Sequence, residues 1–253
     1  MLSKEMNFPL PDNNKSLIIK SVADAISKDI NTFKEEFPLE TDNSIHFLKW
    51  DLTNTNLIGT LPSDYFQCLK ARRGHWKFVL IFHKNSGTLY TLMKQDRFFQ
   101  IREKHNREKV HYLDALASIN RSLESKNESY RQMNLFDIDG QLWKEEAENV
   151  LKELIENIEG EVKVYTLLTF TNDKSEIKDF TAYTLTPSLG IAIEESWNDY
   201  IPAEYDMGIN ENDVVEEEFE DDDIDLTFRD EVSDGEDEQI QLRKAEKEKD
   251  NED

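Results

Sequence analysis

The sequence predicts an α+β fold, in which an antiparallel sheet built from two β-hairpins is packed by several helices and followed by a disordered acidic C-terminal tail. Two stretches have the pattern of strand, turn and strand, and a run with helical periodicity precedes each of them. Helices interleaved with hairpins favour an antiparallel sheet over a doubly wound parallel one. Residues 204–253 are dominated by carboxylates and bury too little apolar surface to offset chain entropy.

The first predicted hairpin joins strands at 76–82 and 88–93 through a Lys-Asn-Ser-Gly turn at 84–87. From Phe78 to Phe82 the strand is apolar on both faces. This pattern predicts a strand in the centre of the sheet.

The second predicted hairpin joins 162–171 to 177–186 through the polar turn 172–176. A further short strand is expected at 189–193. Trp197 to Tyr205 is the last stretch with aromatic residues that could anchor it to a core.

Four helices are predicted from apolar residues at helical spacing. The first covers 14–37, and Pro38 ends it. Two shorter helices are expected near 95–105 and 110–124. A strong helix is expected at 141–158, with an inward face made of Leu142, Trp143, Val150, Leu151, Leu154 and Ile155.

The stretch between the first helix and the first hairpin is harder to assign. Residues 45–52 alternate loosely and predict a strand, and 54–60 predict a loop. Ser63 is a suitable N-cap for a short helix that would end at Gly74.

The charge is distributed unevenly along the chain. Residues 204–253 hold 23 acids and 5 bases, a net −18 of the total −24, so residues 1–203 carry only −6. We therefore divide the chain into an α+β body at 1–203, as one domain or as two lobes at 1–131 and 132–203, and an acidic tail at 204–253. The candidate interaction segment of the tail is Glu216, Glu217, Glu218, Phe219, Glu220, Asp221, Asp222, Asp223, Ile224 and Asp225, with Phe228.

Residues 70–131 are basic, with fourteen Lys and Arg against six acids. One interpretation is a polyanion-binding strip that contacts phosphates. The other is the ordinary solvated face of amphipathic helices. The candidate phosphate contacts are Arg72, Arg73, Lys94, Arg97, Arg102, Lys104, Arg107 and Lys109.

An acidic tail on a body with a basic strip allows three interpretations. The tail could mask the strip in cis, engage a basic site on another molecule as a mimic of nucleic acid, or serve only solubility. An extended carboxylate run rises ~3.3 Å per residue, close to the ~3.4 Å per charge of one DNA strand. The apolar residues within the run favour binding to a partner, because acidic segments with spaced aromatics often fold onto one.

The string Leu135-Phe-Asp-Ile-Asp-Gly-Gln-Leu142 resembles the first motif of haloacid-dehalogenase-type phosphatases. The resemblance implies a nucleophile and Mg²⁺ ligand at Asp137 and an acid/base at Asp139. Gln141 stands where the family has Thr or Ser, and the preceding residues are polar. The alternative is a turn in which Asp139 caps the following helix.

Other chemistry is not indicated. The single cysteine, Cys68, excludes an internal disulfide, and the histidines have no metal-ligand spacing. We predict no cofactor and no metal. Without a signal-peptide pattern or an apolar run of membrane-spanning length, we expect a cytoplasmic protein that contacts no membrane.

Three stretches, Gly74–Ile81, Thr88–Met93 and His111–Asn120, are similar to an uncharacterised family of low-GC Gram-positive bacteria and their phages and mobile elements. That resemblance implies no activity. The sequence therefore predicts a non-enzymatic regulatory or interaction protein that acts through charge. It would be a phage or mobile-element inhibitor whose tail mimics nucleic acid or masks the basic strip, with a basic or nucleic-acid-binding protein as partner. The alternatives are a nucleic-acid-binding module, contacting nucleic acid through 70–131 and autoinhibited by its tail, and a Mg²⁺-dependent phosphoryl-transfer enzyme.

Overall fold

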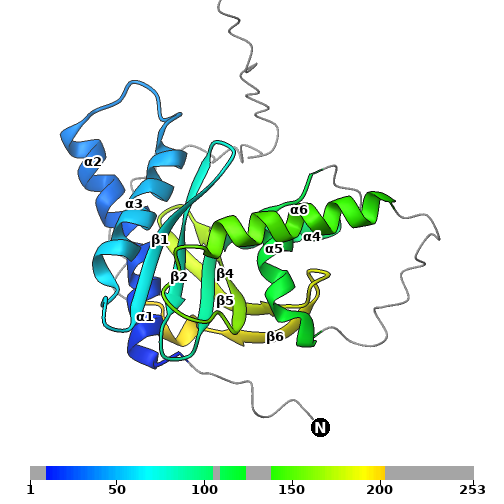
Figure 1. The fold of residues 1–253 in the computed structure, drawn as a ribbon. Helices are drawn as coiled ribbons and strands as arrows, with labels where there is room; N and C mark the ends of the chain where they lie inside the picture. The colour runs from blue at the N-terminus through cyan, green and yellow to red at the C-terminus, as the bar shows by residue number, and fades with distance from the viewer. Residues whose placement is uncertain (1–9, 105–108, 124–137, 203–253) are drawn as a thin grey trace, which may run out of the picture. The chain divides into compact units, whose positions relative to one another are not determined.

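The computed structural model describes residues 10–104, 109–123 and 138–202, with only the backbone at 138–140. Six strands form one sheet in sequence order (Figure 1). They are β1 (Phe66–Arg73), β2 (Trp76–His83), β3 (Thr88–Lys94), β4 (Val164–Asp173), β5 (Glu176–Leu185) and β6 (Ile191–Ser196). Neighbours are antiparallel except β3 and β4, which are parallel. The α+β class is confirmed, and both predicted hairpins are present.

Helices cover both faces of the sheet. One face carries α1 (Asp12–Asp24), the π-helical turn η1 (Ala25–Asp29), α2 (Ile30–Glu36) and α3 (Ile45–Thr60). The other face carries α4 (Gln95–Glu103), α5 (Tyr112–Ala117), the 3₁₀ turn η2 (Ser118–Leu123) and α6 (Ile138–Ile155). The 3₁₀ turn η4 (Asn198–Tyr200) follows β6. No helix in these described ranges is long and apolar enough to cross a membrane.

Strand β2 shows how the two cores arise. Val79 and Ile81 point to the core under α1 and α3, whereas Phe78, Leu80 and Phe82 point to the core under α4, α5 and α6. Both faces are therefore buried, which explains the continuous apolar run and confirms the predicted central position.

The parallel pair links two antiparallel meanders. Thr88 to Lys94 of β3 align with Val164 to Phe170 of β4. The chain between these strands supplies α4, α5 and α6, the crossover that a parallel pair requires. Segments from both sides of residue 131 thus form one continuous sheet.

The region from 45 to 74 differs from the sequence-based expectation. The predicted strand at 45–52 and loop at 54–60 are wrong, because both belong to α3. Its buried residues Ile45, Thr53 and Leu57 recur at helical intervals. The short helix predicted after Ser63 is also wrong, because that stretch contains β1, which pairs with β2 along its whole length.

The helix predicted at 141–158 corresponds to α6, which begins at Ile138 and ends at Ile155. Val150 and Leu154 are buried, as expected of its inward face, whereas Leu142 is 59% exposed. The buried residues of the helix therefore lie in its second half.

Candidate polyanion-binding surface

The turn end of the β1–β2 hairpin extends past the pairing of β2 with β3. β1 and β2 are paired up to Arg73 opposite Trp76, but β2 and β3 are paired only from Ile81 to His83. Figure 1 shows this end of the hairpin beside α3. Gly74, the first of the two turn residues, has a φ of +58°, as the first central position of a type II′ turn requires.

Three basic side chains share one face of this hairpin. Lys70 and Arg72 lie two residues apart on β1, and Lys77 stands directly opposite Arg72 on β2. This is the sheet face on which α1 and α3 pack, because Cys68 and Val79, in the same alternation, contact that core. All three basic residues are exposed, and none forms an ion pair within the described parts of the chain. We call Lys70, Arg72 and Lys77 the basic hairpin face.

The pair Arg72 and Lys77 is electrostatically unfavourable by itself. Side chains directly opposite each other in an antiparallel pair have Cβ atoms ~5 Å apart, and like charges there destabilise the sheet. The Nε of Arg72 donates to the carbonyl oxygen of Gly74 at 2.7 Å, which holds the guanidinium at the turn. A bound anion would relieve this repulsion.

The hairpin is held from both sides. The ring of Trp76 lies edge-to-face with Trp50 of α3, at 5.6 Å between centroids. The Nη2 of Arg73, which stands directly opposite Trp76 in the hairpin, lies 3.6 Å from Oε1 of Glu146 on α6. Arg73 is therefore turned away from the basic hairpin face and already has a carboxylate partner.

Lys94 and Arg97 lie at the same end of the sheet, where β3 leads into α4. The Nζ of Lys94 donates to Oδ1 of Asn172 and lies 5.2 Å from the ring centroid of Phe170. Arg97 donates to the side chain of Gln100 at 3.2 Å. Both side chains are half-buried, so they contribute to packing as well as to charge.

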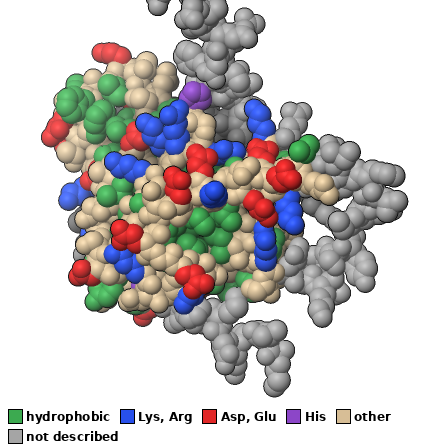
Figure 2. All heavy atoms as spheres, viewed as in Figure 1, with side chains coloured by type: hydrophobic (Ala, Val, Ile, Leu, Met, Phe, Trp, Pro, Cys, Tyr) green, Lys and Arg blue, Asp and Glu red, His purple; other side chains and the backbone are tan. Residues whose placement is uncertain are grey.

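The remaining candidates fall elsewhere. Arg102 and Lys104 are exposed at the end of α4, which packs on the opposite face of the sheet from Lys70 and Arg72. Lys109 is exposed, and Arg107 lies outside the described residues. The candidates that the structure describes are thus distributed over both faces of the sheet. Figure 2 shows basic side chains gathered over α3 and the adjoining hairpin end, whereas acidic and basic side chains alternate along α6.

Lys70 and Lys77 were not among the predicted contacts, although they complete the basic hairpin face. The expected helix at 63–74 concealed Lys70, because helical periodicity separates it from Arg72. For Lys70 the available signal was its spacing of two residues from Arg72, which places both side chains on one face of a strand.

The phosphatase-like string lies largely beyond the described residues, as do Asp137 and the acidic segment 216–225 with Phe228. Asp139 falls within the first turn of α6, so the expectation that it precedes this helix as N-cap is wrong. The described sheet contains one parallel pair, β3 and β4, instead of the long parallel core that accompanies this motif.

Within the described ranges, no three His, Cys, Asp or Glu side chains are grouped so that they could hold a metal ion. Cys68 is half-buried, and desolvation by burial raises the pKa of its thiol to about 11. The thiol is therefore protonated at neutral pH and is a poor nucleophile.

These features define a class: an α+β protein with a mixed sheet and an exposed basic hairpin. The model of a family of unknown function, DUF5986, matches residues 7–244, and the chain belongs to this family. The matched range includes the whole described sheet and also the acidic segment 216–225. No curated protein and no solved structure matches the chain.

Proposed function

We propose that this chain is a non-enzymatic interaction protein that acts through charge. The basic hairpin face binds a polyanion, nucleic acid being the best match, and the acidic segment 216–225 competes for the same face. The observation that carries the proposal is the placement of Arg72 directly opposite Lys77, both exposed and without a described carboxylate partner. A surface that tolerates this repulsion gains most from an anionic ligand.

The geometry of the hairpin fits a nucleic-acid backbone. A two-stranded ribbon is narrow enough to enter the major groove of B-DNA. Lys70 and Arg72 are separated by ~7 Å along β1, about the rise of two nucleotides of one strand. The two tryptophans beside the turn, Trp50 and Trp76, contact each other and are half-buried, so the hairpin offers phosphate contacts more than a stacking platform.

The tail supplies the competing charge. Residues 204–253 carry a net −18, against −6 for the rest of the chain, and the family match extends through most of this tail. An acidic segment covalently linked to the body is present at high effective concentration and would exclude nucleic acid until a partner removes it. A cytoplasmic regulator encoded by a phage or mobile element of low-GC Gram-positive bacteria is one concrete form.

A second candidate function uses the tail in trans. Phe219, Ile224 and Phe228 are spaced through the acidic run and would give it apolar anchors on a partner. The tail would then occupy the basic site of a nucleic-acid-binding protein. The phosphoryl-transfer alternative at Asp137 and Asp139 requires that Asp137→Asn abolish a measured Mg²⁺-dependent phosphatase activity.

The test compares the full chain with a 1–203 truncation for binding to duplex DNA and to single-stranded RNA at low and moderate salt. Competition in cis predicts that the truncation binds more tightly, that binding weakens steeply with salt, and that a 204–253 peptide added in trans inhibits it. Equal binding by both proteins would contradict the masking role. If neither bound, the basic hairpin face would not be a polyanion site, and the tail should next be used as bait for a basic partner.

A further inference from the structure

We propose that a pocket on the sheet, near the start of α1, binds a neutral ligand through a carboxamide group. The pocket contains no residue of the basic hairpin face and lies at the end of β3 where that strand begins. The proposal is therefore independent of polyanion binding by the basic hairpin face.

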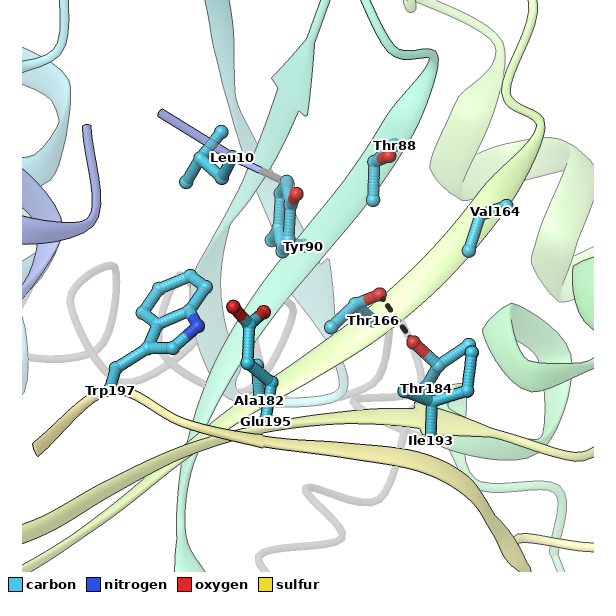
Figure 3. A pocket seen from close by; sticks show the side chains of 10 residues that line it. All are labelled: Leu10, Thr88, Tyr90, Val164, Thr166, Ala182, Thr184, Ile193, Glu195 and Trp197. Carbon is cyan, nitrogen blue, oxygen red and sulfur yellow. Dashed lines mark hydrogen bonds between the residues drawn. The ribbon is translucent and has the colours of Figure 1, made fainter. Parts of the chain in front are cut away.

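Four strands build the pocket, and Leu10 and Trp197 close it (Figure 3). Its volume is about 50 Å³, enough for three or four water molecules or for a group of similar size. A carboxamide has three non-hydrogen atoms, so it fits, while the remainder of the ligand extends toward solvent. The strand residues that line the pocket are Thr88, Tyr90, Val164, Thr166, Ala182, Thr184, Ile193 and Glu195.

Trp197 provides the strongest indication of a ligand. The side chain is only 1% exposed, and its Nε1 is buried without a hydrogen-bond partner among the described residues. The ring is fixed by a parallel stack on Phe180, with 5.8 Å between centroids and 4° between planes. Figure 3 shows the indole nitrogen on the side of the ring that faces the pocket. Since buried N–H groups are almost always satisfied, this donor requires an acceptor from outside the described chain.

Glu195 places an acceptor beside this donor. Its Oε1 accepts from Nζ of Lys15 at 2.7 Å, and its Oε2 receives no hydrogen bond from the described residues. Lys15 is 5% exposed and lies over the rings of Trp197 and Tyr200, at 5.7 and 5.2 Å from their centroids, so the position of the carboxylate is fixed. Glu195 and Trp197 are two residues apart and face the same side of the sheet.

The ligand chemistry follows from this pair of groups. A carboxamide oxygen accepts from the indole N–H, and its N–H donates to Oε2 of Glu195. An anionic ligand is disfavoured, because among the described residues two carboxylates, Glu195 at 2.7 Å and Asp12 at 3.8 Å from Nζ of Lys15, surround this one cation. Burial raises the pKa of Tyr90 to about 12, so this neighbouring phenol remains protonated and neutral at physiological pH. The hydroxyls of Thr166 and Thr184 bond to each other at 3.1 Å and complete a polar wall.

The test follows the indole N–H resonance of Trp197 in the full chain during titration with three ligands of nearly equal shape. Propionamide offers both an acceptor and a donor, butanone only an acceptor, and propionate an anion. We expect a saturable shift with propionamide and binding at least about fivefold weaker with butanone and propionate, the loss typical of one hydrogen bond. Glutamine with blocked amino and carboxyl groups then distinguishes a protein side chain from a small amide as the natural ligand. It competes with propionamide if the natural ligand is a side chain.

Trp197→Phe keeps the ring stack and removes the donor, and it also assigns the resonance. It should weaken propionamide binding about fivefold to tenfold. Binding to this variant is measured from the chemical shifts of its other residues. If the variant does not fold, the three-ligand comparison on the unaltered chain still decides. An absence of saturation with propionamide, or equal affinity for butanone, would mean that the pocket holds only water and would overturn the proposal.

Discussion

Single side chains hold neighbouring strands of this sheet together, and Asn120 is the clearest case. Its side chain is buried in η2, 2% exposed, and reaches two strands at once. The amide nitrogen donates to the carbonyls of Tyr165 and Leu185 at 2.8 Å each, and the amide oxygen accepts from the backbone N–H of Tyr165 at 2.9 Å. One side chain thus satisfies backbone groups of β4 and β5 that have no other described side-chain partner.

Replacing Asn120 with Ala should lower the free energy of unfolding by about 2–4 kcal/mol, because three hydrogen bonds are lost and buried backbone groups remain unsatisfied. Urea denaturation followed by circular dichroism measures the loss. Asn157→Ala, at an exposed position, is the matched control and should change stability little. A decrease in the free energy of unfolding below ~1 kcal/mol for Asn120→Ala would show that water replaces the side chain between β4 and β5.

Tyr90 predicts how stability depends on alkaline pH. Desolvation by burial raises the pKa of its hydroxyl from 10.0 to about 12. Below pH 10 the free energy of unfolding keeps the full contribution of the neutral Tyr90 phenol. This contribution is lost as pH rises toward 12, because the phenol ionises at a lower pH in the unfolded chain than in the folded protein. Stability should fall by up to about 1.4 kcal/mol per pH unit in this window for this residue.

Urea denaturation across the alkaline range tests this prediction. Tyr90→Phe should reduce the slope, while Tyr65→Phe, at a position 49% exposed, serves as control. Burial also raises the pKa of Tyr165, so part of the slope should persist in the Tyr90 variant. An unchanged slope in Tyr90→Phe would show that this phenol is hydrated in the folded protein.

At the scale of elements, the sequence predicted the strands and hairpins whose apolar and turn residues form a local pattern. Phe78 to Phe82 and the second hairpin have strand residues around good turn sequences, and both were found. Residues 45–60 and 66–73 were wrong because their conformation depends on tertiary contacts. α3 has only three buried residues, so its helical pattern is weak, and β1 is a strand because it pairs with β2.

The same substitution, Gly to Ala, should have opposite effects on stability in the β1–β2 turn and in α3. Gly74 has a φ of +58°, whereas Gly59 lies in α3, where an added methyl group would meet no atom within 4 Å. Gly74→Ala should destabilise the protein by about 1–2 kcal/mol, because a side chain is strained at positive φ. Gly59→Ala should stabilise it by up to about 1 kcal/mol, since Ala favours the helix. Thermal denaturation of both variants checks this, and two effects of the same sign would contradict the turn assignment.

The candidate site was only partly accessible from the sequence. The excess of bases in 70–131 was visible, but which of them share a surface depended on strand pairing. Arg72 was identified, Lys70 and Lys77 were not, and Arg73 turned out to pair with Glu146. The pocket at Trp197 was not predictable, because its walls come from β3, β4, β5 and β6, which meet only in the folded sheet.

At the scale of the whole molecule, charge is separated between the body, with a net −6, and the tail, with a net −18. The body is close to neutral for its size, so a polyanion would be attracted only by a local surface such as the basic hairpin face. Exposed bases at the end of α4 are the competing explanation, and they lie on the other side of the sheet.

The most direct measurement is the salt dependence of DNA binding by the 1–203 truncation and two triple variants, each shown to melt cooperatively. One variant carries Lys70→Gln, Arg72→Gln and Lys77→Gln, and the matched control carries Arg102→Gln, Lys104→Gln and Lys109→Gln. We predict that the hairpin variant loses most of its affinity and that the slope of log K against log salt falls in magnitude by about 2–3, while the control binds like the parent. Equal losses in both variants, or a loss confined to the α4 variant, would contradict the assignment of the site to the hairpin.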